Sequence, residues 1–151
     1  MKILVAAIAM LACLCMPANA ADTPPFTVTL SGPDTVVAGD KVILSVAMKN
    51  VSDHAIRIFF GERYTILIHD EDGKEPVHKG PGGGSSGYVP VEPGKIFTDR
   101  EYLSAEYDLS KPGKYLVQLS RQEDDEDLKS RIVKSNEITI TVAPRKQDRQ
   151  P

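Results

Sequence analysis

The sequence contains no tryptophan and only two cysteines, Cys13 and Cys15, which both lie near its start. One long apolar run occurs, from Ile3 to Met16, and it is too short to span a bilayer. Lysine and arginine nowhere cluster among aromatic residues, so the electrostatic pattern of a nucleic-acid-binding protein is missing. We therefore expect no nucleic-acid partner and no transmembrane segment after processing.

The first twenty residues have the layout of a secretory signal peptide. A lysine at position 2 precedes the apolar run, and Ala18-Asn19-Ala20 matches a small-x-small cleavage site. We predict cleavage after Ala20, with Ala18 and Ala20 as the recognised residues. A lipoprotein-like site at Leu11-Ala12-Cys13 fits less well, because Met10 stands where that pattern prefers leucine. The prediction is a periplasmic or secreted protein rather than a lipoprotein.

Cleavage at this site would remove both cysteines with the signal peptide, residues 1–20. The mature chain would then have no disulfide, no thiolate nucleophile and no cysteine metal ligand, so its stability must come from a hydrophobic core. Its length suits one domain, which we place at residues 21–143. Six of the last eight residues are polar or charged, and we expect residues 144–151 to form a disordered tail.

From residue 26 onward, short segments alternate apolar and polar residues, and Gly, Pro, Asn and Asp separate them. This alternation is typical of strands that bury one face, and helical spacing is nowhere sustained. The pattern predicts an all-β fold with antiparallel strands. The expected strands are 26–30, 42–48, 56–60, 64–68, 95–103, 115–120 and 138–142. We expect residues 104–110 and 121–136 to be connections.

Two segments resemble immunoglobulin-like domains. Gly39 to Val46 is similar to the entry into strand B, with Val46 where antibody domains carry their first cysteine. In the approach to strand F, Gly113 precedes Tyr115, a candidate tyrosine corner, and Val117 takes the second cysteine position. Without disulfide or tryptophan, the chain resembles the cysteine-free bacterial members. The resemblance implies an immunoglobulin-like antiparallel β-sandwich of about seven strands.

A narrower resemblance covers residues 49–122. The order of Asn50-Val51-Ser52, Tyr64 to Asp70, Val91 to Lys95 and Lys111 to Tyr115 is similar to the intracellular proteinase inhibitor family of the Bacillus type. These motifs are mostly turns and core strands, so they indicate the fold more than inhibition. The export signal and the absent tryptophan depart from that family. Proteinase inhibition is the function that this resemblance implies.

The stretch from residue 80 to residue 87 holds five glycines and two serines. It has little to bury and a large entropy cost of ordering, so we expect a mobile loop. Mobile loops on a rigid sandwich often carry recognition. The candidate partner-binding residues are Gly80, Gly82, Gly83, Gly84, Ser85, Ser86, Gly87 and Tyr88.

Two acidic stretches suggest metal binding at first sight. His69, Asp70 and Asp72 lie near the end of one expected strand, and residues 123–127 are five consecutive carboxylates. A solvated hairpin tip and a solvated loop explain them without a metal. Asn50-Val51-Ser52 also has the spacing of a glycosylation acceptor, although a polar corner explains it more simply. We expect no metal and no cofactor.

These observations favour an exported, non-catalytic module of the bacterial cell envelope that binds an unknown protein partner, with proteinase inhibition as the sharper form. A passive structural or accessory domain of an envelope assembly is the alternative. A metal or ligand carrier is a third hypothesis, which depends on the acidic stretches. The sequence identifies no catalytic residues, and we expect the protein not to be an enzyme.

Overall fold

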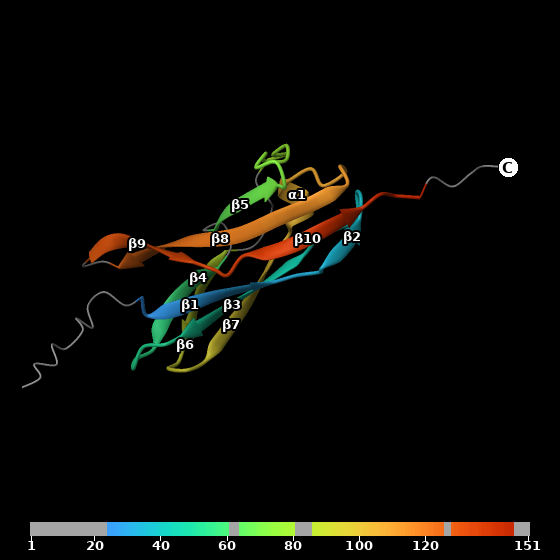
Figure 1. Cartoon of the computed structure of the whole chain (residues 1–151). Helices are drawn as coiled ribbons and strands as arrows, with labels where there is room; N and C mark the ends of the chain where they lie inside the picture. The colour runs from blue at the N-terminus through green and yellow to red at the C-terminus, as the bar shows by residue number, and fades with distance from the viewer. Residues whose placement is uncertain (1–23, 61–63, 81–85, 126–127, 147–151) are drawn as a thin grey trace, which may run out of the picture.

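A computed structural model describes residues 24–60, 64–80, 86–125 and 128–146, with side chains described outside 123–131. These residues form ten strands and one short helix, so the all-β prediction is confirmed (Figure 1). The predicted signal peptide lies outside the described residues. The elements are β1 (Phe26–Ser31), β2 (Thr35–Val37), β3 (Leu44–Asn50), β4 (Ile56–Phe60), β5 (Tyr64–Asp70), β6 (Gly87–Val91), β7 (Ile96–Glu101), α1 (Leu103–Glu106), β8 (Gly113–Asp125), β9 (Leu128–Lys134) and β10 (Ile138–Ala143).

The strands form three sheets. The first has the order β1-β3-β7, the second has the order β2-β10-β8-β5 with β9 also paired to β8, and the third is the pair β4-β6. In Figure 1 the five-stranded sheet lies above the three-stranded sheet, and β4 and β6 lie at the opposite end from α1 and β2. Among these strands β2 and β10 pair in parallel, and the other pairs are antiparallel.

The hydrophobic core collects the inward residues of both large sheets. The β1 residues Phe26, Val28 and Leu30 are buried, and their neighbours along the strand are exposed. Val46 of β3 and Val117 of β8 are fully buried. Each such side chain contributes about 1.5–3 kcal/mol by leaving water. The burial of these side chains from both large sheets therefore stabilises the fold.

The N-terminal part of the chain contributes one strand to each of the two large sheets. β1 pairs with β3 in one sheet, and β2 pairs with β10 in the other. The crossing passes Gly32, where a Cβ atom would lie 2.6 Å from Cδ2 of Leu44. A larger residue at position 32 would displace the buried Leu44 side chain, so glycine allows the chain to pass close to β3 where it changes sheet.

Asn136 also joins the two large sheets. Its side-chain Oδ1 accepts from the backbone N–H of Leu30 at 2.8 Å, and its Nδ2 donates to the Leu30 carbonyl at 3.0 Å. The amide thus satisfies both backbone groups of one β1 residue, as a paired strand would.

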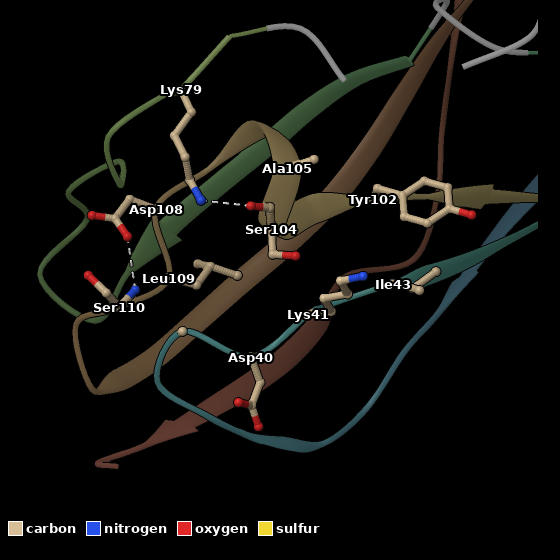
Figure 2. Close-up of a pocket in the computed structure, with 11 residues that line it drawn as sticks. Asp40, Lys41, Ile43, Lys79, Tyr102, Ser104, Ala105, Asp108, Leu109 and Ser110 are labelled. Carbon is tan, nitrogen blue, oxygen red and sulfur yellow. Dashed lines mark hydrogen bonds between the residues drawn. The ribbon is translucent and has the colours of Figure 1, made fainter. Parts of the chain in front are cut away.

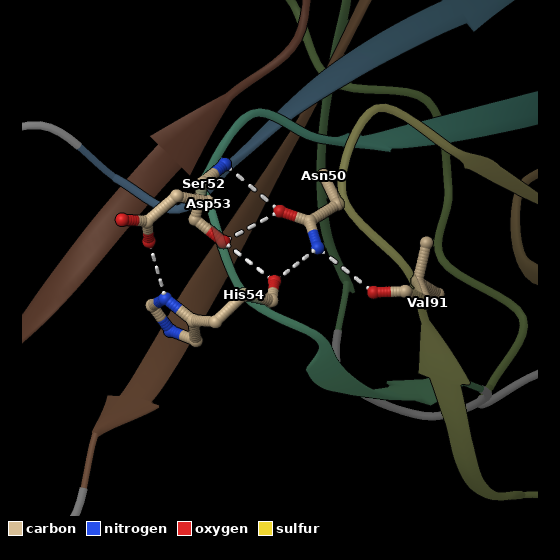
Figure 3. A network of polar contacts seen from close by, with 5 residues as sticks. All are labelled: Asn50, Ser52, Asp53, His54 and Val91. Atoms are coloured by element: carbon tan, nitrogen blue, oxygen red, sulfur yellow. Dashed lines mark hydrogen bonds and ion pairs between the residues drawn. The ribbon is translucent and has the colours of Figure 1, made fainter.

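Asn50 is the last residue of β3, and its side chain connects β3 to the turn before β4 and to the end of β6 (Figure 3). It is fully buried, and its Nδ2 donates to the carbonyls of His54 and Val91, both at 2.8 Å. Its Oδ1 accepts from the backbone N–H of Ser52 at 2.9 Å and from the Ser52 hydroxyl at 2.7 Å. An amide that is buried and fully bonded is closed to a glycan, so the Asn-x-Ser spacing marks a structural corner.

Two expected connections contain regular structure. β8 continues to Asp125 and pairs with β9, so the segment 121–136 is largely a hairpin. Strand pairing uses backbone groups, which a polar sequence supplies as well as an apolar one. The helix α1 occupies part of the segment 104–110, where Leu103 and Tyr107 are buried one turn apart.

The predicted tail begins with an anchored residue. Arg145 donates from Nε to the carbonyl of Ala38 at 3.1 Å and from Nη2 to Asp40 at 2.6 Å. These bonds hold the chain just beyond β10, where we expected disorder, and residues 147–151 lie outside the described part. In the described residues no helix is long and apolar enough to cross a membrane.

Candidate binding sites

The β4-β6 pair presents aromatic side chains to solvent. The two strands pair from Ile56 opposite Val91 to Phe60 opposite Gly87. Alternation turns Ile58 and Val91 into the core, where they are 2% and 4% exposed. The intervening residues point outward. We call their side chains the aromatic face, which consists of Arg57, Phe59, Tyr88 and Pro90.

The aromatic face is ordered by contacts among its own members. The rings of Phe59 and Tyr88 meet edge to face, with centroids 4.9 Å apart. The guanidinium carbon of Arg57 lies 4.7 Å from the Tyr88 ring centroid, within cation–π range. Tyr88 remains 55% exposed. Within the described residues no carboxylate pairs with Arg57, so its charge is available to a partner.

Phe60 fastens the β4-β6 pair to the rest of the molecule. Its ring lies over Gly87, where a Cβ atom would come within 3.3 Å of it. The same ring packs against Phe97 of β7, with centroids 5.8 Å apart. Together with the Asn50 bond to the Val91 carbonyl, this contact holds the aromatic face rigid relative to the core.

The predicted partner-binding loop is only partly described. Gly82, Gly83, Gly84 and Ser85 lie outside the described residues, and Gly80 and Ser86 border them. Gly87 and Tyr88 are not loop residues, because they open β6 and pair with Phe60 and Phe59. The pairing brings Tyr88 beside Arg57 and Phe59, which the sequence analysis did not select. Their outward position in an alternating strand was the signal that identifies them.

Residues 83–87 also have the Gly-x-Ser-x-Gly spacing of a hydrolase nucleophile elbow. That motif needs a strand before the serine and a helix after it. Here strand β6 begins at Gly87. Because a strand and not a helix follows the motif, the spacing alone does not indicate a catalytic serine.

A pocket of about 510 Å³ lies at the end of the molecule near α1 (Figure 2). Three segments that are far apart in sequence surround it: the turn before β3, the α1 region, and the segment between β5 and β6. The turn needs Gly39, whose φ of +82° favours glycine, and the Gly39 N–H donates to the Leu109 carbonyl at 3.4 Å. The lining residues are Gly39, Asp40, Lys41, Ile43, Lys79, Tyr102, Ser104, Ala105, Asp108, Leu109 and Ser110.

The acids of this pocket are already engaged. Asp40 pairs with Arg145, and Asp108 accepts from the Ser110 N–H at 3.1 Å. Hydrogen bonds from the Ser110 hydroxyl and from its N–H hold the pKa of Asp108 below its usual value. Lys79 donates to the Ser104 carbonyl at 2.7 Å. Lys41 has no ion-pair or hydrogen-bond partner within the described residues.

A polar cluster lies between the large sheets near the aromatic face. Arg121 is 5% exposed, and its guanidinium lies 5.7 Å from the ring centroids of both Phe26 and Tyr64. The Tyr64 hydroxyl donates to Asp99 at 3.4 Å. Burial, with the Asp99 charge, raises the pKa of Tyr64 far above its ordinary value. These groups satisfy one another and explain how a strand of the core tolerates a cation.

Two acids meet at the end of β7. Burial, together with the nearby Glu106 and Asp99 carboxylates, raises the pKa of Glu101 to about 7. The Tyr102 N–H donates to the Glu101 carboxylate at 3.1 Å. The carboxyl group of Glu101 therefore holds its proton more tightly than an exposed glutamate does.

The histidine considered for metal binding lies in solvent. His69 is exposed and is directed away from the core, as its place in β5 requires. No cluster of metal-ligating side chains occurs among the residues that the structure describes. The carboxylates of 123–127 fall outside the described side chains.

The comparisons with known proteins identify no family. No family model matches the chain, and no curated protein matches it. The solved structures that resemble it include a mutant β-glucosidase from Listeria innocua in complex with laminaribiose and a β-glucosidase from Erythrobacter marinus. They share 17% and 14% identity, with TM-scores of 0.40 and 0.41. The matches cover 74% and 77% of this chain but only 16% and 15% of theirs, and this likeness carries no conclusion about activity.

Proposed function

We propose that this chain is an exported, non-catalytic module of the bacterial cell envelope that binds a protein partner through the aromatic face. The single observation that supports this is the solvent exposure of Tyr88 in contact with Phe59 and Arg57 on a rigid strand pair. Tyrosine and arginine are enriched among the residues that dominate binding energy in protein interfaces. The rings of Phe59 and Tyr88 supply apolar surface to the face, and apolar surface gains free energy when a partner removes it from water.

The chemistry of the face favours one kind of partner. Arg57 offers a guanidinium without a carboxylate partner in the described chain, beside two rings and Pro90. A partner segment that presents an acidic side chain next to an apolar one would pair with both features. We therefore propose an acidic, partly apolar protein surface as the partner.

The immunoglobulin-like assignment is part of the proposal. The strand orders β1-β3-β7 and β5-β8-β10 correspond to A-B-E and C-F-G of a constant-type sandwich. The Tyr115 hydroxyl donates to the Lys111 carbonyl, four residues upstream, at 2.9 Å. That is the hydrogen bond of a tyrosine corner, and it supports the resemblance in strand F.

The experiment uses the exported chain immobilised and exposed to envelope extract, with Tyr88→Ser and Arg57→Ala as face variants. Leu67→Ser and Thr139→Ala, which change outward residues of the five-stranded sheet, are matched controls. We expect one acidic protein to be retained by the parent and control chains, and its affinity to fall at least tenfold for each face variant. Equal retention by all variants would reject the aromatic face.

Proteinase inhibition is the sharper form of this proposal. If the retained partner is a protease, the parent chain should slow its hydrolysis of a peptide substrate and Tyr88→Ser should not. If the retained protease keeps full activity, the binding proposal stands and the inhibition proposal is rejected.

A passive structural role is the second candidate, and the free edge of β7 favours it. In the described residues β7 pairs only with β3, so its other edge is open to a strand from an assembly partner. Thr98→Pro, on the open strand, should then release the chain from the assembly while Tyr88→Ser should not.

A further inference from the structure

We propose that the pocket near α1 is a second binding site, which takes a small organic anion composed of one carboxylate on an apolar body. The helix α1 lies at the opposite end of the molecule from β4 and β6 (Figure 1), so this pocket is remote from the aromatic face. The inference is independent of the proposed function, because no residue is shared between the two sites.

The size and walls of the pocket suit such a molecule. Its volume of about 510 Å³ falls within the range of small-molecule sites, about 300–1,000 Å³. Leu109 is buried at 3% exposure, whereas Ile43 and Tyr102 remain 39% and 46% exposed. Apolar surface at the base and partly exposed apolar side chains around it favour a ligand with an apolar body.

The charges of the pocket favour an anion over a cation. Asp40 is paired with Arg145, and Asp108 is bonded to the Ser110 N–H, so neither carboxylate needs a cationic ligand. Lys79 and Lys41 flank the pocket from different sides (Figure 2). Lys79 uses one bond, to the Ser104 carbonyl, and an ammonium group has three protons to donate. Lys41 is uncommitted in the described chain.

The Ser104 hydroxyl offers a directional hydrogen bond beside the two lysines. The Ser104 Oγ accepts from the Val42 N–H at 2.9 Å, so the hydroxyl proton is left to donate. A carboxylate between the two lysines would accept from this hydroxyl as well. A ligand with several phosphates fits less well, because two ammonium groups beside apolar walls cannot compensate its charge.

The test is an NMR titration of the full exported chain with 4-phenylbutyrate, and with the uncharged 4-phenylbutanamide for comparison. We expect saturable shifts in the amides of residues 39–43 and 102–110, and affinity for the amide analogue at least fivefold lower. Lys41→Gln and Lys79→Gln should each weaken the anion at least fivefold. Lys95→Gln, which removes an exposed lysine far from the pocket, is the matched control and should change nothing.

Ala105→Leu provides a second arm that leaves the charges intact. Its larger side chain should fill part of the pocket and weaken both probes alike, and the unchanged amide spectrum elsewhere would show that the variant is folded. Shifts scattered over other surfaces, no saturable shift, or equal affinity of Lys41→Gln and Lys95→Gln would each overturn the site. None of these results would bear on the proposal that the aromatic face captures a protein partner, because that proposal is tested by different variants.

Discussion

The five-stranded sheet and the β4-β6 pair bury their inward faces in the same way but differ in what they show to water. Outward positions of the five-stranded sheet carry polar side chains such as Thr65 and Thr139 and single aliphatic side chains such as Leu67, but no pair of aromatic rings among the described residues. At the equivalent positions the β4-β6 pair carries Phe59 and Tyr88. Folding requires only the inward set, so the outward aromatic residues need another explanation, and binding supplies one.

The largest expected effect comes from the inward side of this comparison. Arg121→Ala should reduce the free energy of unfolding by about 3 kcal/mol, because it removes a buried cation and leaves Tyr64 and Asp99 without it. Urea unfolding measures the loss. Arg57→Ala, on the outward side, should cost about 0.5 kcal/mol or less. If Arg121→Ala and Arg57→Ala lowered the free energy of unfolding by similar amounts, the proposed difference between inward and outward residues would be wrong.

The corner that supports the β4-β6 pair should be nearly as sensitive. Asn50→Ala removes two donor bonds and two acceptor bonds from a fully buried site, and we expect a loss of about 2 kcal/mol in thermal or urea unfolding. Ser52→Ala keeps the bonds from Asn50 to the His54 and Val91 carbonyls, so it should cost less than half as much. If Asn50→Ala leaves stability unchanged, the corner does not hold the pair.

Glu101 should make stability depend on pH. Its pKa is raised from the ordinary value of 4.5 to about 7 in the folded chain, so the folded state binds the proton more tightly than the unfolded state. Stability then falls as pH rises from 4.5 to 7 and stays low above it. Glu101→Gln should abolish this fall and gain about 1 kcal/mol at pH 8, a value reduced for partial exposure. Equal pH profiles of the two chains would refute the assignment.

Tyr88→Ser on the aromatic face should have only a small effect on stability. It removes a ring that is more than half exposed and one edge-to-face contact, which is worth about 0.5–1 kcal/mol. The same change should abolish partner capture. A loss of stability as large as that of Arg121→Ala would mean that Tyr88 is a structural residue and would remove the main support for the proposed site.

The sequence predicts the strands whose alternation reflects burial. Phe26, Val28 and Leu30 specify β1, because their alternation with polar residues matches their burial. β9 was missed, because its pairing with β8 relies on backbone groups and leaves side chains such as Ile132 exposed. The alternation of apolar and polar residues reflects burial, so it predicts a strand only where one face of that strand is buried.

The candidate site was predictable only in part, since it depends on pairing. Tyr88 was selected for its place beside a glycine-rich stretch, and its real neighbours, Arg57 and Phe59, come from another strand. Alternation alone marks all three as outward, but only the register of β4 with β6 brings them together. The pocket was missed for the same reason, because three distant segments meet in it.

The parallel pairing of β2 with β10 has a mechanical consequence. Thr35, Val36 and Val37 lie beside Thr141, Val142 and Ala143 in the same direction. A force that pulls the chain before β2 and the chain after β10 in opposite directions runs along these strands. The hydrogen bonds between them are then loaded in shear and must break together rather than one after another. A protein built in this way resists stretching along its own chain.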